Sequence, residues 1–320
     1  MNIVCATDDN FVQHCSIMLT SLLVNNRDVN IYILTEGLNT ENETIIRDEV
    51  ESKNGRVNFC IVDSSIVEKF PMPDNGSINH ISRATYYRLL IPDLLPLDVD
   101  KAIYLDCDII INGSLEELWK IDLTDNALGV VRQIGYGFEA ERLGYPIEYG
   151  YFNAGVNLIN ITYWRQNNVT TLLMNYIADN FDKIKFHDQD TLNAVLHKKC
   201  LRLPSQWNMT SAAYMFQIAK RGDKRNGVII EDYALEKESA YKYRKNPIVI
   251  HYVSKPKPWS KNCVHPLYHL YYDYAKKTIN YSNIKKQDDF SRSIAVLKDW
   301  GKNVISAIKQ SIKKTDLTRM

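Results

Sequence analysis

The sequence lacks the features that mark several common classes of protein. No two cysteines are spaced as Cys-x-x-Cys, which argues against the usual zinc sites and redox motifs. No stretch approaches the roughly 18 consecutive apolar residues of a membrane span, and the chain begins on an apolar segment without the basic region of a signal peptide. There is no internal repeat, and the net charge is only +1, so the chain as a whole is not typical of nucleic-acid-binding proteins.

The six cysteines are scattered along the chain, at positions 5, 15, 60, 107, 200 and 263. Cys5 and Cys107 lie in apolar runs typical of strands, where a free cysteine is more often a small core residue than a reactive thiol. No disulfide framework is indicated, and this usage fits a reducing cytoplasm. We therefore expect a cytoplasmic protein.

Size and charge together suggest one large domain with an appendage. The 320 residues are 45% hydrophobic and 24% charged, which is ordinary for a globular protein with a sizeable core. Residues 276–320 contain eleven lysines and arginines against four aspartates, a net charge of +7 that leaves −6 for residues 1–275. We expect a main domain over 1–275 and a basic tail over 276–320.

The first third of the sequence alternates strand-like and helix-like segments. Apolar runs predict strands at 2–6, 29–34, 57–62 and 101–105. Apolar spacing and capping residues predict helices at 11–23, 39–52 and 82–90. This alternation predicts an α/β fold with a mostly parallel central sheet, in which ligands bind beyond the carboxyl ends of the strands.

The remainder is less regular. We expect a β-rich segment at 129–164 that includes a Gly/Tyr-rich, mobile loop at 135–151, followed by helices at 169–182 and 188–196. Residues 201–260 are predicted to be mostly irregular, with a short strand at 248–252. The tail contains an amphipathic helical pattern, formed by Ile294, Leu297, Val304, Ile305, Ile308 and Ile312.

Two acidic turns follow predicted strands, and the second is the stronger candidate for chemistry. Asp106-Cys107-Asp108 lies between two apolar runs, and residues i and i+2 of an extended segment point to the same side. Paired carboxylates repel each other unless a hard cation such as Mg²⁺ or Mn²⁺ lies between them. A solvated acidic turn is the alternative, but an acidic pair between apolar runs is costly unless it is paired or metal-bound.

Three further segments combine polar and apolar residues in unusual ways. His251 follows an apolar run and precedes a stiff basic segment, 252–259, that suits a phosphate, although a surface loop is an equally good interpretation. Asn153-Ala154-Gly155 lets the backbone approach a ligand closely, or simply makes a tight turn. Asp188-Gln189-Asp190 begins a predicted helix, where helix capping explains one acid better than two.

Taken together, these segments resemble the family 8 retaining glycosyltransferases, to which bacterial lipooligosaccharide galactosyl- and glucosyltransferases and glycogenin belong. The resemblance runs from Met1 to about Trp259. The matching segments occur in the family's order and are 3–11, 80–89, 104–108, 152–156, 188–190 and 251–259. Each segment alone is weak evidence, whereas six in order are specific.

The resemblance implies a GT-A fold with a Rossmann-like nucleotide-binding half, and transfer of a hexose from a UDP-sugar with Mn²⁺ or Mg²⁺. It implies that Asp106, Asp108 and His251 hold the metal. Donor-binding residues implied in the same way are Ala6, Asp8, Asn10, Arg88, Asn153, Ala154 and Lys257. Gln189 and Asp188 would lie at the reacting carbon, and His80 and Gln133 would contact the acceptor.

The acceptor is the least defined partner. Gln133 stands where a lactose-using relative has an acid, and hydrogen bonds to sugar hydroxyls set specificity. We expect a glycan or lipid-linked glycan acceptor in lipopolysaccharide or cell-surface polysaccharide synthesis. The basic amphipathic pattern at 290–315 favours peripheral contact with the inner face of the cytoplasmic membrane over packing on the body or in a dimer.

Two other functions remain as alternatives. An Asp-x-Asp after a strand also begins the haloacid-dehalogenase-type phosphatases, but Ile110 stands where they need Thr or Val and the motif lies far from the N-terminus. A non-catalytic module that binds a UDP-sugar would carry the same residues and show binding without turnover. Within the leading interpretation, UDP-galactose is favoured slightly over UDP-glucose.

Overall fold

The computed structural model describes residues 1–68, 70, 83–134, 136–214, 224–225, 228–229, 232–253, 255–260 and 262–281. His80 and the predicted tail helix lie outside these residues. The main sheet has seven strands in the order β3-β2-β1-β4-β7-β6-β8. Their bounds are β1 Asn2–Ala6, β2 Asn30–Thr35, β3 Arg56–Ile61, β4 Lys101–Leu105, β6 Leu128–Arg132, β7 Phe152–Asn160 and β8 Cys200–Arg202.

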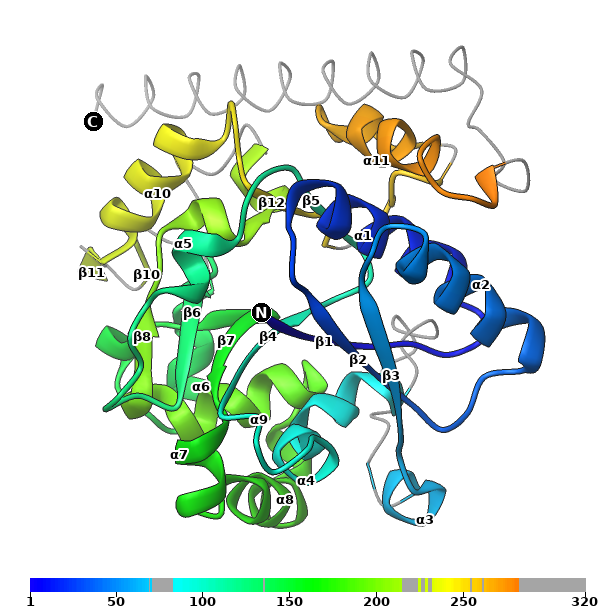
Figure 1. The fold of residues 1–320 in the computed structure, drawn as a ribbon. Helices are drawn as coiled ribbons and strands as arrows, with labels where there is room; N and C mark the ends of the chain where they lie inside the picture. Colours follow the sequence, from blue (N-terminus) through cyan, green and yellow to red (C-terminus); the bar gives the residue numbers. More distant parts are fainter. Residues whose placement is uncertain are drawn as a thin grey trace, which may run out of the picture.

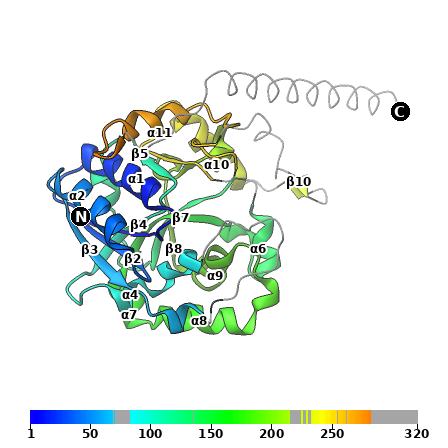
Figure 2. The same cartoon turned by 90° about the vertical axis from the view of Figure 1, so that its right-hand side faces the viewer.

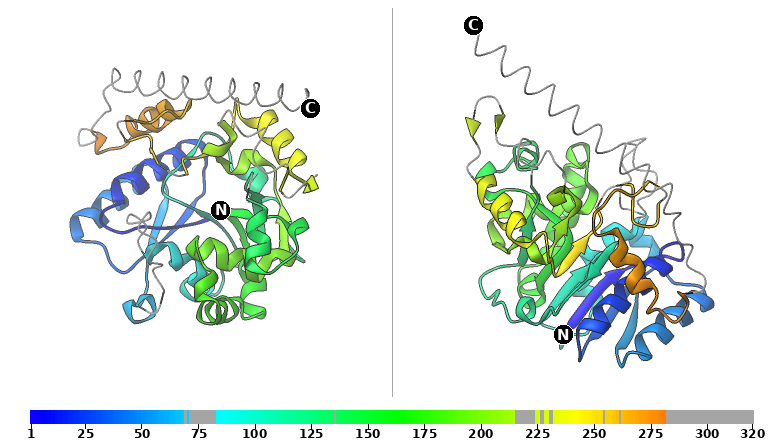
Figure 3. Two further views of the ribbon diagram at one scale, coloured as in Figure 1. Left: turned by 180° about the vertical axis from the view of Figure 1, so that it is seen from behind. Right: turned by 90° about the horizontal axis from the view of Figure 1, so that it is seen from above.

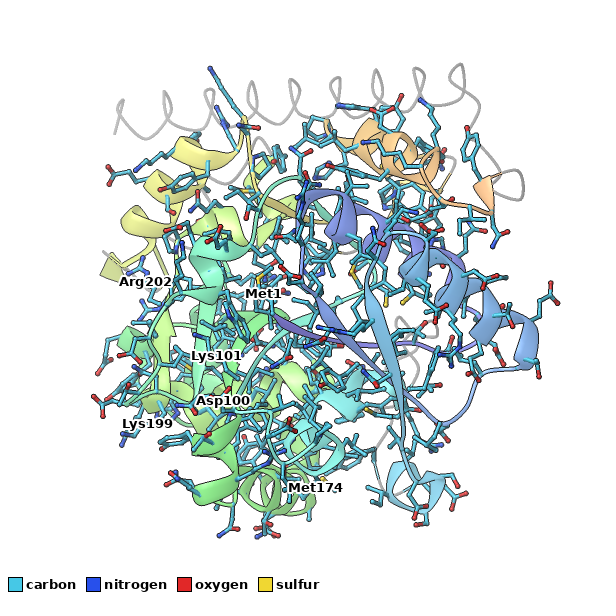
Figure 4. The ribbon with its side chains drawn as sticks, in the orientation of Figure 1. Met1, Asp100, Lys101, Met174, Lys199 and Arg202 are labelled. Atoms are coloured by element: carbon cyan, nitrogen blue, oxygen red, sulfur yellow. The ribbon has the colours of Figure 1, made fainter. Side chains whose placement is uncertain are left out.

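This sheet is mostly parallel, as predicted. Strand β7 is the exception, because it runs antiparallel to both of its neighbours, β4 and β6. In the view of Figure 4, Lys101 at the start of β4 lies between Met1 and Asp100, and Arg202 at the end of β8 lies toward the left edge. Because β7 is reversed, its first residues lie beside the carboxyl end of β4, where Leu105 pairs with Val156.

Helices cover both faces of the sheet (Figure 1). On one face, α1 Val12–Asn25 and α2 Thr40–Glu51 enclose an apolar core with the inward side chains of β1 and β2. On the other face, a second core packs against α4 Ile91–Leu94, α7 Ile161–Gln166, α8 Val169–Asp179 and α9 His187–Leu196. Successive strand residues therefore alternate between the two cores, as Ile3 and Val4 do.

A smaller sheet lies beside the carboxyl end of β4. Its order is β5-β12-β9, with bounds β5 Ile109–Ile111, β9 Met209–Thr210 and β12 Val249–His251. In the register, His251 is opposite Ile109, one residue after the acidic turn. Helix α11 Tyr268–Ala275 packs beside α1, as Figures 2 and 3 both show. The remaining elements are α3 Ser64–Val67, α5 Glu116–Trp119, α6 Phe138–Leu143, α10 Asp232–Tyr243, β10 Lys224–Arg225 and β11 Val228–Ile229.

Most predicted elements are confirmed, including the helix predicted at 82–90, which is a 3₁₀ helix over residues 83–90. Two predictions were wrong. The predicted mobile loop at 135–151 contains α6, whose Ala140 and Leu143 are buried against Tyr145 and Tyr151. The segment predicted as irregular at 201–260 contains α10, a charged helix without a broad apolar face.

Candidate active site

Asp106, Asp108 and His251 converge at the carboxyl end of β4. The two aspartates occupy the turn between β4 and β5, and His251 ends β12. His251 Nε2 lies 3.1 Å from Asp108 Oδ1 and 3.7 Å from Asp106 Oδ2. The potential ligand atoms of all three residues lie within 4.8 Å of one another. Residues far apart in the sequence thus present one nitrogen and two carboxylates to a common point.

Gly155 is what allows this convergence. Strand β7 passes directly behind the cluster, and the Asp106 backbone N–H donates to the Gly155 carbonyl at 2.9 Å. A Cβ at Gly155 would lie 2.1 Å from His251 Cε1 and 2.7 Å from Asp106 Oδ2. The glycine is therefore needed for space, because any side chain here would occupy the position of two of the three candidate ligands.

A chain of amide groups fixes the orientation of His251. The Gly155 backbone N–H donates to Asn153 Oδ1 at 3.0 Å, so that oxygen is an acceptor. Asn208 Nδ2 donates to the same oxygen at 2.9 Å, which leaves Asn208 Oδ1 facing His251 Nδ1 at 2.9 Å. Nδ1 must then carry the proton and donate. Nε2 is consequently the ring nitrogen that faces the two carboxylates.

This arrangement fits a divalent cation. A lone pair facing two carboxylates is repulsive unless a proton or metal ion lies between them, and two carboxylates with one imidazole suit a hard or borderline divalent ion. Lys257 Nζ donates to Asp108 Oδ2 and to the Tyr252 carbonyl. Burial opposes ionisation of Asp108, but Lys257 and His251 outweigh it and lower the pKa of Asp108 well below its usual range. The site is thus built for anionic carboxylates next to positive charge.

Arg88 joins the metal-ligand candidates to the start of α9. Its guanidinium lies 2.8 Å from both Asp106 Oδ1 and Asp188 Oδ2, and only 5% of the residue is exposed. Residues three apart eclipse on a 3₁₀ helix, so Thr85 lies on the same side and donates to Asp188 Oδ1. Burial raises the pKa of Asp188 to about 6, against the opposing effect of Arg88.

Gln189 is held by hydrogen bonds on both sides of its amide. The Ala154 backbone N–H and Asn153 Nδ2 both donate to Gln189 Oε1 at 3.0 Å. Gln189 Nε2 in turn donates to the Tyr151 hydroxyl at 2.9 Å. The side chain therefore belongs to the same network as Asn153, with its oxygen occupied by two donors.

Asp190 supports the same hydrogen-bond network from a buried position. It is fully buried and accepts from the backbone N–H groups of Lys185 and Phe186 at 2.7 and 2.9 Å, from Arg142 at 2.8 Å and from the Tyr151 hydroxyl at 2.7 Å. Because four donors satisfy this carboxylate, a structural role accounts for Asp190 in the Asp188-Gln189-Asp190 segment. Arg142 belongs to α6, the helix that the sequence did not predict.

Other predicted site residues lie at or just after the ends of β1 and β6, and are Ala6, Asp8, Asn10 and Gln133. Asp8 accepts from the Asn10 backbone N–H at 3.0 Å just after β1, which is parallel to β4 and ends at the same edge. Ala6 ends β1 and accepts from Cys107 through its carbonyl. Gln133, after β6, lies 3.5 Å from Asn153 Nδ2.

Comparison with known proteins decides the family. The sequence profile named Glycosyl transferase family 8 matches residues 2–263. The chain belongs to this family. It is therefore an enzyme of the glycosyltransferase class, as the six motif segments predicted.

Some relatives of this glycosyltransferase match it over most of their length. It is 28% identical over 284 residues to General stress protein A of Bacillus subtilis, covering 87% of this chain and 94% of that protein. It is 25% identical over 275 residues to the lipopolysaccharide 1,2-glucosyltransferase of Escherichia coli, covering 83% and 75%. The galactosyltransferase LgtC, solved with donor and acceptor sugar analogues, superposes with a TM-score of 0.73 at 25% identity, covering 88% and 97%. The predicted GT-A fold is confirmed.

Asn208 is a candidate site residue, among those that the structure describes, that the sequence did not reveal. It precedes β9 in a segment without a motif, and its contact with His251 spans 43 residues. We predict that Asn208→Ala lowers the affinity for Mn²⁺ by about 10- to 100-fold, because loss of such a partner frees the ligand's tautomer and ring orientation. Mn²⁺ titration followed by electron paramagnetic resonance would measure this, with exposed Asn167→Ala as the control. An unchanged affinity in folded Asn208→Ala would contradict the orienting role.

Proposed function

We propose that this enzyme is a retaining hexosyltransferase that moves galactose or glucose from a UDP-sugar to a glycan acceptor with a divalent metal ion, Mn²⁺ in preference to Mg²⁺. The observation that carries the proposal is the cluster of Asp106, Asp108 and His251, with Nε2 facing both carboxylates. Family membership supplies the reaction class, and this cluster supports the metal dependence.

The proposed mechanism depends on stabilising the leaving diphosphate. A divalent ion bound by the cluster would supply positive charge to the phosphate oxygens. Lys257, which donates to Asp108 Oδ2 beside the cluster, would add a second positive charge for the diphosphate. Asp8, Asn10 and Ala6 would hold the nucleoside at the end of β1.

The transferred sugar would lie against β7 and the start of α9. Asn153, Ala154 and Asp188 would contact its hydroxyls, while Arg88 keeps Asp188 and Asp106 in place. Gln189 Oε1 already accepts two hydrogen bonds, and a carboxamide is a weak nucleophile, so we favour attack by the acceptor on the face that the leaving group departs from. A glycosyl adduct trapped on Asp188, Gln189 or Asp190 would overturn this mechanism.

The proposals for the donor sugar and the pathway are based on what the relatives are named for. LgtC is a galactosyltransferase and the Escherichia coli relative is a lipopolysaccharide glucosyltransferase. We propose UDP-galactose first and UDP-glucose as the alternative, in lipopolysaccharide or cell-surface polysaccharide synthesis, with a glycan or lipid-linked glycan as acceptor, contacted by Gln133 and His80. Within the described part of the chain, no helix is long and apolar enough to cross a bilayer. Residues 290–315, which lie outside that part, are proposed as a peripheral contact with the cytoplasmic face of the membrane.

The test is release of UDP from a panel of UDP- and GDP-sugars with Mn²⁺, Mg²⁺ or EDTA. We expect slow hydrolysis of one UDP-hexose with Mn²⁺, less with Mg²⁺ and none with EDTA, because the leaving group needs the metal charge. Isothermal titration calorimetry in the same buffers would measure whether UDP binding depends on the metal ion. Metal-independent UDP binding without release from any sugar nucleotide would favour the non-catalytic binding module.

A further inference from the structure

Three cysteine side chains form a cluster that includes the middle residue of the acidic turn. Cys5 comes from β1, Cys15 from α1 and Cys107 from between Asp106 and Asp108. Their sulfur atoms all lie within 4.8 Å of one another, and Cys5 Sγ is 3.9 Å from Cys15 Sγ. Three residues that the sequence scatters over 103 positions therefore share one point in the core.

The three thiols are buried. The exposed fractions are 0% for Cys5, 0% for Cys15 and 6% for Cys107. All three pack in the apolar core between the sheet and α1, with Leu19 and Val131 in the same core. Cys107 is buried in this core, whereas Asp106 and Asp108 on either side of it are partly exposed.

The spacing of the sulfur atoms suits a single metal ion. Metal–thiolate bonds are about 2.3 Å long, so three sulfurs in a plane around one ion lie about 4.0 Å apart. The Cys5–Cys15 separation is already 3.9 Å, and the limit of 4.8 Å for the other pairs requires only small side-chain movements. Thiolates select soft ions, whereas the Asp106–Asp108–His251 cluster, with its carboxylate oxygens, selects harder ones.

We propose that Cys5, Cys15 and Cys107 form a second metal site, which binds a soft, thiophilic cation such as Cu(I) or Cd²⁺ and is distinct from the Asp106–Asp108–His251 cluster. Binding forms metal–sulfur bonds, and each thiol that becomes a ligand releases its proton to solvent, so no electron transfer is needed. It also removes the hydrogen bond from Cys107 Sγ to the Ala6 carbonyl. The site does not depend on the proposed sugar transfer.

Cadmium titration of the reduced, full-length protein under anaerobic conditions tests this site. Thiolate ligands give an ultraviolet sulfur-to-cadmium charge-transfer band that carboxylate and imidazole ligands do not. We expect one ion per chain with this band, at least a tenfold loss of affinity in Cys15→Ala and Cys5→Ala, and unchanged binding in Cys60→Ala. Cys60 lies on β3, outside the cluster. Asp108→Asn should also leave the band unchanged.

A second measurement keeps the test independent of variants that fail to fold. X-ray absorption at the cadmium edge of the wild-type protein, loaded with one equivalent of Cd²⁺ while saturating Mn²⁺ occupies the Asp106–Asp108–His251 cluster, should show three sulfur neighbours. A shell of oxygen and nitrogen alone, or a charge-transfer band that survives unchanged in folded Cys5→Ala and Cys15→Ala, would overturn the proposal and leave the three cysteines as ordinary core residues.

Discussion

Asp108→Asn should reduce metal-dependent UDP release by at least about 1000-fold while leaving the fold intact. The substitution keeps the size of the side chain but removes the charge of one candidate ligand. Metal stabilisation of a leaving group contributes several kcal/mol, and each 1.4 kcal/mol corresponds to about a tenfold change in rate. Asp108 also pairs with Lys257, so the variant loses the group that holds this lysine beside the site.

The matched control is Asp125→Asn, an aspartate of the same chemistry in an exposed turn. Wild type, control and variant should be compared for UDP release over a range of Mn²⁺ concentrations, with circular dichroism to confirm folding. The metal assignment fails if Asp108→Asn retains wild-type Mn²⁺ dependence and rate. Activity that returns at high Mn²⁺ would instead support it, because a weakened site still fills at higher concentration.

The charges around the site give one reason to expect a divalent ion and not a monovalent one. Asp106, Asp108 and Asp188 contribute three carboxylates, while Arg88 and Lys257 contribute two positive charges. Without an ion the group is negative overall and would repel a diphosphate. With a divalent ion it becomes positive overall, which attracts the leaving group of the proposed donor. Calorimetry should therefore show tighter UDP binding with Mn²⁺ present.

The parts of the fold that depend on local pattern were predictable from the sequence. Strands β1 and β4 match the predicted bounds exactly, because each is a short apolar run that ends in acidic residues. Helix α1 was predictable from the apolar spacing between Phe11 and Leu22. Helix α6 was missed because glycine and tyrosine dominate its surroundings, and its burial comes from contacts with Tyr151 and Phe186. Such contacts have no local signature.

Within the candidate site, too, local sequence patterns reveal some residues and miss those that depend on distant contacts. The three metal-ligand candidates stand out as motifs, and the structure places them together. Asp190 also stands out, but the structure shows a buried anchor for Arg142 and Tyr151. Asn208 has no motif at all, because its importance arises only when β9 lies next to β12. Sequence patterns thus find residues that carry chemistry more readily than residues that orient them.

Gly155→Ala should abolish metal binding almost as completely as loss of a ligand. The added Cβ would lie 2.1 Å from Cε1 and 2.7 Å from Nδ1 of His251, and 2.7 Å from Asp106 Oδ2. His251 cannot easily move, because Asn208 holds its Nδ1 and the backbone of β12 pairs with both β5 and β9. We expect at least a 100-fold loss of Mn²⁺ affinity and of UDP release, with a stability cost of about 1–3 kcal/mol from overpacking.

Gly113→Ala provides the matched control for this substitution. A Cβ at Gly113 would meet the Ile248 side chain at 3.5 Å, which is ordinary van der Waals contact. Both variants add one methyl group near the β5-β12 sheet, but only Gly155→Ala places it among the ligand candidates. Mn²⁺ titration and thermal unfolding should be measured for both proteins. If folded Gly155→Ala bound Mn²⁺ as the wild type does, His251 and Asp106 would not be ligands of one ion, because that position of the histidine ring is incompatible with the added carbon.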